Sequence, residues 1–506
     1  MTAPTLPDPL AQAHARSPET LIMGKSPREV SGWPQRAQAA AGATIFSAVL
    51  DITEVEERSH LIGNGKRLVA AALALAATLA PTTVAYASPE ASASPTVSDP
   101  VRALDRIAHP LLSTDPGTGT ADLRALGAMV GDAKVVGLGE ATHGSHEFFA
   151  LKDRVFRYLV EQKGFTTFAL EMSWSAGLRI DDYLQHGNGD ARQVVHETMA
   201  GSPWDREEFV TLVQWMHDHN RQHPDRPVHF LGDDIGAPSL DELVFDAVTD
   251  YVRRTHPESL PRVNDLLTGL RPLDDAFGYL NNRPLAERQQ NAARARQLLK
   301  LMESQGRAGD DDFEFALQNA RNIVQTYTFL TVNVDDPASL TAMERYRDQV
   351  MAETTMWWQR RTGGRILLSA ADGHVGYTAT DPTTYPKTQG SFLHDALGAD
   401  YLSIGTTFDQ GSFLSKDQAI GGDWKTFTVP PAGPGTNEYT LDQVRYRDYY
   451  TDLRKVPATA RNWLDISRPT YDVGTQFPNS TTPELAIGRA YDVLFHLHTV
   501  REASKL

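Results

Sequence analysis

The 506-residue sequence contains no cysteine, which excludes disulfide bonds, thiolate nucleophiles and cysteine metal ligands together. It is also short of positive charge, because 48 lysines and arginines stand against 64 aspartates and glutamates, for a formal net charge of −16. No basic stripe interleaved with aromatic residues occurs, and acidic surfaces repel phosphate backbones. We therefore do not expect nucleic acid as a partner.

Two catalytic signatures are missing as well. No Gly-x-Ser-x-Gly motif occurs anywhere in the chain, which disfavours a serine hydrolase. No His-Glu-x-x-His motif or comparably tight ligand spacing is present, so the sequence does not demand a metal. There is no internal repeat. We expect an enzyme that needs no cofactor, and we keep a divalent metal as the alternative.

The one sustained apolar run near the start of the chain is too short to span a bilayer. It covers residues 68–79, follows Lys66 and Arg67, and is followed by Ala85-Tyr86-Ala87 before Ser88. A basic stretch, a short apolar stretch and a small-x-small site are the parts of a secretory signal peptide. This order predicts a secreted protein with no stable membrane insertion after cleavage.

Residues 1–65 need a separate explanation, since a signal peptide at 66–87 would normally begin the chain. Residues 1–65 are interpreted as a mis-assigned or disordered extension, or as a cytoplasmic tail if the apolar run is an uncleaved anchor. Residues 88–102 have the serine, proline and alanine composition of a linker. The remaining segment, 103–506, is predicted to be the functional domain.

Within residues 103–506 short apolar runs alternate with longer helical ones, which is typical of an α/β fold with parallel crossovers. A helix is predicted over 147–163, with Ser145 as its N-cap and Gly164 as its stop. The predicted fold is a mostly parallel sheet flanked by helices. Its strands are expected at 134–138, 165–170, 228–231, 365–369 and 401–404.

About 130 residues separate the third and fourth predicted strands, and nearly all of them have a helical pattern. We predict a helical insertion over about 239–361, with helices at 285–305, 313–327 and 342–361. Long insertions of this kind often carry function. We expect this one to cover the C-terminal edge of the strands.

Titratable residues stand at the ends of four predicted strands. Glu140, Glu171, Asp234 and His374 each fall at or just past a strand's C-terminal end, and His143 follows three residues after Glu140. In parallel sheets this edge is where ligands bind. A single charge there is usually solvated, whereas four that converge predict a chemical site.

His143 is the candidate general base of this site, with Glu140 or Glu171 to fix its tautomer. The structural alternative is a loop histidine that caps the following helix. The Gly137-Leu138-Gly139 segment resembles the start of a dinucleotide fingerprint, but Thr142 stands where the third glycine should be. The same histidines and carboxylates are also possible ligands of a divalent metal.

An ordered series of motifs resembles the erythromycin esterase family over roughly residues 103–500. It comprises Gly139-Glu140-Ala141-Thr142-His143-Gly144, Glu147-Phe148-Phe149, Leu151-Lys152, Gly164-Phe165, Leu170-Glu171, Trp204, Trp215, Asn220, Phe230-Leu231-Gly232-Asp233-Asp234, Arg347-Asp348 and His374-Val375. The resemblance implies metal-independent hydrolysis of a small-molecule ester or macrolide lactone, as in antibiotic resistance. It leaves the oligomeric state open.

The resemblance also implies residue roles. His143 would be the base, Glu140 and Glu171 would orient it or the water, and His374 would complete the site or bind the oxyanion. Substrate contacts would come from Lys152, Asp234 and Asp372. One position departs from the family, because Ala371 stands where a histidine is common. This departure keeps two alternatives open, a divalent-metal-dependent hydrolase and a catalytically impaired binding protein.

Overall fold

The computed structural model describes residues 100–187, 189–306, 309–419, 421–479 and 481–506. The predicted extension and signal peptide, and most of the predicted linker, lie outside these residues. The first described helix, α2 (Pro100–Asp105), already includes the last three residues of the range interpreted as linker.

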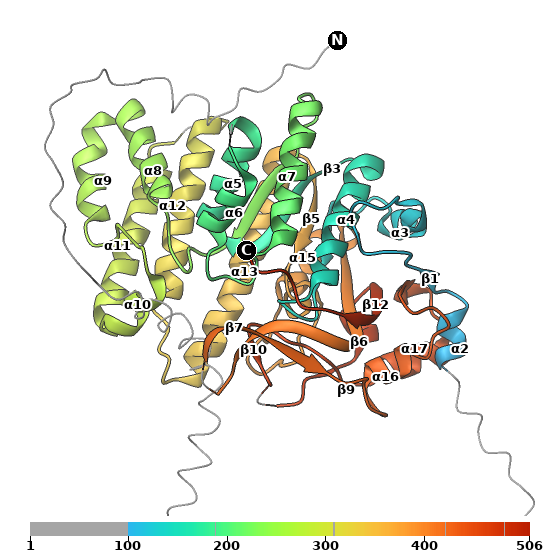
Figure 1. Ribbon diagram of the computed structural model, residues 1–506. Coiled ribbons are helices and arrows are strands. Elements are labelled where there is room, and N and C mark those ends of the chain that lie inside the picture. The colour runs from blue at the N-terminus through green and yellow to red at the C-terminus, as the bar shows by residue number, and fades with distance from the viewer. Residues whose placement is uncertain (1–99, 188, 307–308, 420, 480) are drawn as a thin grey trace, which may run out of the picture.

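A central sheet organises the molecule, and its middle is parallel, as predicted (Figure 1). Strands β12, β6, β2, β5, β3 and β4 are neighbours in that order and all run parallel. Antiparallel β8 and β1 extend the β12 edge, and β7 and β10 pair with the far part of β6. The strands of this sheet are β1 (His109–Pro110), β2 (Val135–Leu138), β3 (Phe165–Ser173), β4 (His229–Asp234), β5 (Arg365–Ser369), β6 (Tyr401–Asp417), β7 (Gly421–Val429), β8 (Tyr449–Asp452), β10 (Gln476–Phe477) and β12 (Val493–Val500).

The five predicted strands are β2, β3, β4, β5 and β6, and β5 has the predicted bounds. Strands β3 and β4 run further than predicted because their pairing continues to Ser173 and Asp234. Asp234 therefore pairs with Ser173 in the last part of the ladder, and Glu171 lies in the register shift between Leu170 and Ser173. Strand β6 is also longer, since its second half pairs with β7.

Alternate residues of the parallel strands enter two different hydrophobic cores, one on each face of the sheet. Val136 and Leu138 pack with the core that contains α4, whereas Val135 packs with the core of the opposite face. The first face is covered by α3 (Arg124–Val130), α4 (His146–Lys163), α6 (Ala191–Met199) and α7 (Glu207–Gln222). Helix α5 (Trp174–His186) contributes to both cores beside β4.

Helix α4 begins and ends close to the predicted residues. Gly164 ends it with φ of 68°, a left-handed conformation that favours glycine. Ser145 holds the N-cap position, but its hydroxyl lies 2.5 Å from that of Thr142 and does not cap a helix N–H. The hydroxyl thus fixes the turn that carries Glu140 and His143.

The segment between β4 and β5 consists mainly of helices. The three predicted there are α11, α12 and α13, and α8 to α12 stand together beside the sheet (Figure 1). Trp358 of α13 donates to Thr167 of β3 at 3.0 Å, which seats that helix on the second face. The helices are α8 (Glu242–Thr255), α9 (Leu260–Leu267), α10 (Ala276–Asn282), α11 (Leu285–Glu303), α12 (Asp311–Phe329) and α13 (Pro337–Thr362).

The N-terminal half of α13 continues past the end of β4 and covers the C-terminal edge of the strands. The rest of the chain adds short elements around β6, β8 and β12: α14 (Asp372–Val375), α15 (Gln389–Leu397), α16 (Asn437–Leu441), α17 (Ala458–Leu464), α18 (Ile487–Ala490) and a ribbon of β9 (Arg468–Pro469) and β11 (Glu484–Leu485). None of the helices in the described ranges is long and apolar enough to cross a membrane.

Candidate active site

A hydrogen-bonded chain of Lys152, Glu140 and His143 lies at the end of β2. Glu140 Oε1 lies 2.6 Å from Nδ1 of His143, and Glu140 Oε2 accepts a hydrogen bond from the Lys152 ammonium. Lys152 comes from the second turn of α4 and also donates to the Ala370 carbonyl at 3.1 Å. The loop after β2 and the face of α4 that packs on the sheet thus converge on one carboxylate.

The charges around His143 favour its protonated form. Burial alone would lower the pKa of His143, but the hydrogen bond and charge of Glu140, together with the charge of Glu171, raise the pKa above its usual value. The ring is 7% exposed and lies edge-on to Trp204, with ring centroids 5.9 Å apart. His143 is therefore a buried imidazole with a fixed orientation.

Arg347, from α13, joins the ends of β3 and β4. Its guanidinium donates to Asp234 Oδ2 through Nε at 2.9 Å and Nη2 at 2.5 Å, and Nη2 also donates to Glu171 Oε1 at 2.9 Å. The second oxygen of Glu171 accepts the backbone N–H of Ala371 at 3.0 Å. A single cation thus pairs with two carboxylates of neighbouring strands.

His374 lies between two carboxylates. Its Nδ1 is 2.6 Å from Asp348 Oδ1 and its Nε2 is 3.2 Å from Glu171 Oε1. Burial would lower the pKa of His374, yet Glu171 and Asp348 hold that pKa well above its usual value. Burial would likewise raise the pKa of Glu171, but His374 and Arg347 hold it well below its usual range. The pair is an imidazolium and a carboxylate.

Asp372 lies behind this layer and braces the loop after β2. Its carboxylate accepts the Thr406 N–H at 3.0 Å and the Thr406 hydroxyl at 3.2 Å, and that hydroxyl accepts the Ala141 N–H at 2.8 Å. Burial, reinforced by the charge of Asp472, raises the pKa of Asp372 well above its usual value. Asp372 thus links β6 to the Glu140 loop.

Gly139 makes room for this contact. A Cβ at Gly139 would come within 1.8 Å of an Asp372 oxygen, and a Cβ at Gly137 would come within 2.4 Å of the Tyr401 hydroxyl. The two glycines that resemble a dinucleotide fingerprint are therefore explained by side chains of this protein that approach the backbone closely.

Further titratable side chains surround the two histidines. Burial raises the pKa of Asp472, while the charges of His143 and His374 act on it in the opposite direction. Burial also raises the pKa of Glu344 to about 7. The charge of Glu344, together with burial, raises the pKa of Tyr385, whose ring is edge-on to His374 at 6.1 Å. These groups form the rim of the candidate site.

A pocket of about 310 Å³ opens beside Asp472. Tyr471 and Phe477 supply apolar surface to it, and Thr470 and Asn479 supply polar groups. Its volume lies at the lower end of the range of small-molecule sites. The pocket and the two histidines share Asp472, so a ligand in the pocket would adjoin the charged site.

The structure brings the predicted site residues together in two connected sets. Glu140, His143 and Lys152 form one set, while Glu171, Asp234 and His374 form the other through Arg347; Asp372 stands behind both. Lys152, expected to contact substrate, is 1% exposed and bonds only inward in the described structure. The carboxylates of Asp234 and Asp372 are likewise committed to Arg347 and Thr406.

Sequence reasoning assigned no role to several residues of the site. Arg347 and Asp348 were noted only as a motif match, and no pattern indicates which way they point from a helix. Asp472 and Tyr385 come from irregular segments that carry no periodic signal. One signal could have found two of these residues. Residues 347–348 are a charged pair in a helix that is predicted to lie over the sheet edge.

Comparisons with known proteins agree on one family. A family model described as erythromycin esterase matches residues 160–500. The chain is 25% identical over 366 residues to the erythromycin esterase type II of Escherichia coli, an alignment that spans 66% of this chain and 84% of that protein.

Solved structures have the same fold. A crystal structure from Bacillus cereus superposes with a TM-score of 0.74 at 29% identity, covering 81% of this chain and 99% of that one. A mutant of the erythromycin esterase EreC in its open conformation superposes with a TM-score of 0.61 at 18% identity, covering 76% of this chain and 96% of that one. The likeness to EreC concerns the fold alone. With the family match over most of the chain, these findings lead to one conclusion: the chain belongs to the erythromycin esterase family of hydrolases.

Proposed function

We propose that the protein hydrolyses a carboxylic ester or macrolide lactone of a small molecule, with His143 as the base that activates water. The observation that carries the proposal is the 2.6 Å contact between Nδ1 of His143 and Glu140. A carboxylate accepts, so Nδ1 donates and Nε2 keeps its lone pair for a proton from water. The buried Lys152 ammonium offsets the charge of Glu140 and holds it in place.

The two histidines have different roles in this proposal because their surroundings differ. Both nitrogens of His374 face carboxylates, so His374 is a charged donor and no base. His374 and Arg347 pair with three carboxylates, and among the described contacts only Nη1 of Arg347 meets none of them, which leaves its positive charge to face a substrate oxygen. Such charge stabilises an oxyanion that forms in a water-poor site.

The proposed reaction has two steps. Water attacks the carbonyl carbon while Nε2 of His143 takes one of its protons, and the carbonyl oxygen becomes an oxyanion. The intermediate then expels the alcohol oxygen, which receives the proton back from His143, and a carboxylic acid remains. The pocket beside Asp472 would hold part of the substrate. This route requires no metal ion.

The arrangement also bears on the metal alternative. Lys152 and Arg347 stand against the carboxylates that would have to bind an ion, namely Glu140, Glu171 and Asp234. A cation between those carboxylates would have to displace a buried ammonium or guanidinium. This favours the metal-free reaction, and activity that persists after chelation and dialysis is the expected result.

The test is mass spectrometry of macrolides and small esters incubated with chelator-treated protein, beside a His143→Ala variant. We expect a product heavier by one water, and a loss of turnover of about 10²–10⁴-fold in the variant, whose circular dichroism spectrum should remain that of the folded protein. His196→Ala is the matched control, because His196 is an exposed histidine paired with Asp205. Near-normal turnover by His143→Ala would refute the assigned role. Ligand-induced stabilisation with no product from any ester would instead indicate a binding protein.

A further inference from the structure

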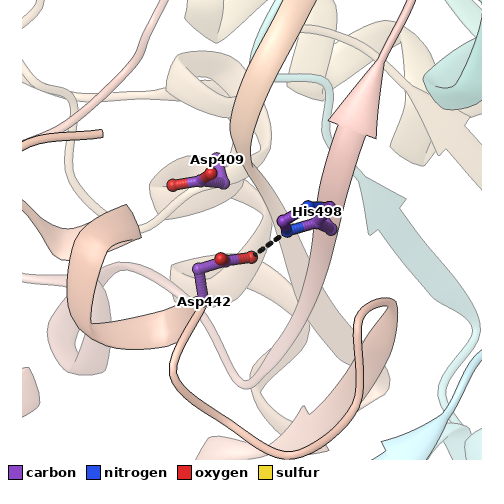
Figure 2. A group of neighbouring side chains, drawn as sticks. All are labelled: Asp409, Asp442 and His498. Atoms are coloured by element: carbon purple, nitrogen blue, oxygen red, sulfur yellow. Dashed lines mark hydrogen bonds and ion pairs between the residues drawn. The ribbon is translucent and has the colours of Figure 1, made fainter. Parts of the chain in front are cut away.

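A second cluster of titratable groups lies between β6 and β12, apart from the candidate active site. Asp409 comes from β6, His498 from β12 and Asp442 from the residue after α16 (Figure 2). The strands are parallel, with Leu497 opposite Phe408 and Thr499 opposite Gln410. This register puts His498 beside Asp409 on one face of the sheet.

The three side chains come close enough to share a ligand. One atom from each, a carboxylate oxygen or an imidazole nitrogen, lies within 4.8 Å of the other two. Figure 2 shows them at the corners of a triangle, with a contact of 2.7 Å between His498 Nδ1 and Asp442 Oδ1. Metal–ligand bonds of about 2.0–2.2 Å place neighbouring ligand atoms roughly 3–3.5 Å apart. Only a small inward movement of Asp409 is needed to reach such spacing.

Asp409 is a buried residue, and its two carboxylate oxygens differ in their contacts. The residue is 4% exposed, and its Oδ1 accepts the backbone N–H of Ala432 at 3.1 Å. Within the described ranges no donor contacts its other oxygen. Burial raises the pKa of Asp409, and the charge of Asp442 raises it further. The second oxygen of Asp409 is therefore available to a further ligand.

The nearest groups that can carry positive charge are the histidines of β12. Asp442 Oδ1 contacts the two histidines of β12, His498 and His496, the second at 3.3 Å. No lysine or arginine among the described residues pairs with Asp409 or Asp442. Two carboxylates with one neutral imidazole would balance the charge of a divalent ion. His496, fully buried, would orient Asp442 from behind.

We propose that Asp409, Asp442 and His498 bind a divalent cation of the Zn²⁺ or Mn²⁺ class. Mixed carboxylate and imidazole ligands suit these ions and not soft ones such as Cu⁺. The ion joins β6, β12 and the segment after α16. Because β6 also carries Thr406, which holds Asp372 and the Glu140 loop, the ion stabilises the scaffold behind the active site. It takes no part in the chemistry.

The test is calorimetric titration of the chelator-treated full chain with Zn²⁺. We expect one tight site per chain and a rise in melting temperature on binding. The isosteric Asp409→Asn and the separate His498→Gln should each weaken binding at least tenfold. His196→Gln, which removes an exposed histidine beside an aspartate, is the matched control and should bind like the unaltered protein.

Three outcomes would overturn the proposal. They are no stoichiometric Zn²⁺ binding by the unaltered chain, binding that survives both substitutions, and binding lost in His143→Ala but kept in Asp409→Asn. The last would put the ion in the active site and count against metal-free hydrolysis as well. The first result needs no variant, so a variant that fails to fold does not obscure the answer. Failure of this proposal alone leaves the hydrolase proposal intact.

Discussion

At the residue scale, the two histidines of the site differ in what their nitrogens face. His143 has one carboxylate on Nδ1, whereas His374 has one on each nitrogen. The second carboxylate keeps His374 charged. His143 has no second carboxylate, so its Nε2 is available to take a proton from water. A base and a fixed cation thus arise from the same residue type.

The raised pKa of His143 predicts the pH dependence of catalysis. The base form exists only above the pKa, so kcat/KM should fall as the pH is lowered through it, with a midpoint above about 6.5, the usual histidine value. The charge of Glu171 contributes to the raised pKa. Glu171→Gln should therefore move this acid limb to lower pH, besides reducing kcat.

The pH profiles of the two proteins check this prediction. Glu353→Gln is the control, because Glu353 is an exposed glutamate of α13 and should leave the limb in place. An acid limb that stays put, or moves to higher pH, in Glu171→Gln would mean that another group titrates.

The site could be predicted in part because the ends of strands can be recognised in a sequence. Glu140, Glu171, Asp234 and His374 follow apolar runs, and parallel strands bring such positions to one edge. Their pairing could not be derived. Lys152 donates to Glu140 because the face of α4 that contacts the loop is set by packing. No local pattern encodes that choice.

At the element scale, α13 completes the site. Its C-terminal half packs on β3 through Trp358, and its N-terminal half supplies Arg347 and Asp348. Periodicity predicted a helix at 342–361, whereas the structure begins it at Pro337 with Asp336 as N-cap. The helix could be predicted, but its contact with the strand ends depends on the path of α8 to α12.

Arg347→Leu should be strongly destabilising. The substitution leaves Glu171 and Asp234 buried beside each other with no guanidinium, and removing one partner of a buried ion pair typically costs about 3–5 kcal/mol. Chemical denaturation monitored by circular dichroism measures the free energy of unfolding. Arg347→Lys should recover part of the loss, since lysine keeps the charge without the fork.

Arg345→Leu is the matched control on the same helix. Arg345 is exposed and lies over the Phe392 ring at 5.4 Å, so its loss should cost less than about 1 kcal/mol. An equal loss of unfolding free energy in the two variants would show that the ion pairs of Arg347 do not stabilise the fold.

Strand β12 illustrates what the sequence pattern does not reveal. It lies between β6 and β8 inside the sheet, yet no strand was predicted at 493–500. Its His496 and His498 interrupt an otherwise apolar run in polar surroundings made by Asp442 and Asp409. Polar residues in an interior strand become intelligible only when their partners from distant segments are known.

At the scale of the whole molecule, the site draws on residues from Glu140 to Asp472. The sheet order places β2 between β5 and β6, and β3 next to β4, so that five segments far apart in the chain meet at one edge. The fold class follows from alternation and parallel crossovers, whereas the strand order is known only from the structure. The positions of Tyr385 and Asp472 at the rim of the site depend on tertiary packing and could not be predicted.

The region before this domain is expected to be removable. The described structure begins with α2 at Pro100, and every residue of both proposed sites lies after it. We propose that the protein is exported and cleaved between Ala87 and Ser88, since the basic, apolar and small-x-small stretches end there.

A chain of residues 88–506 should then melt at the same temperature as the full chain and hydrolyse the same substrate at the same rate. N-terminal sequencing of the protein recovered from the medium of an expressing culture, beside melting curves of both chains, checks this. A mature N-terminus upstream of residue 60 would refute the cleavage, and a lower melting temperature of 88–506 would show that the preceding residues belong to the folded domain.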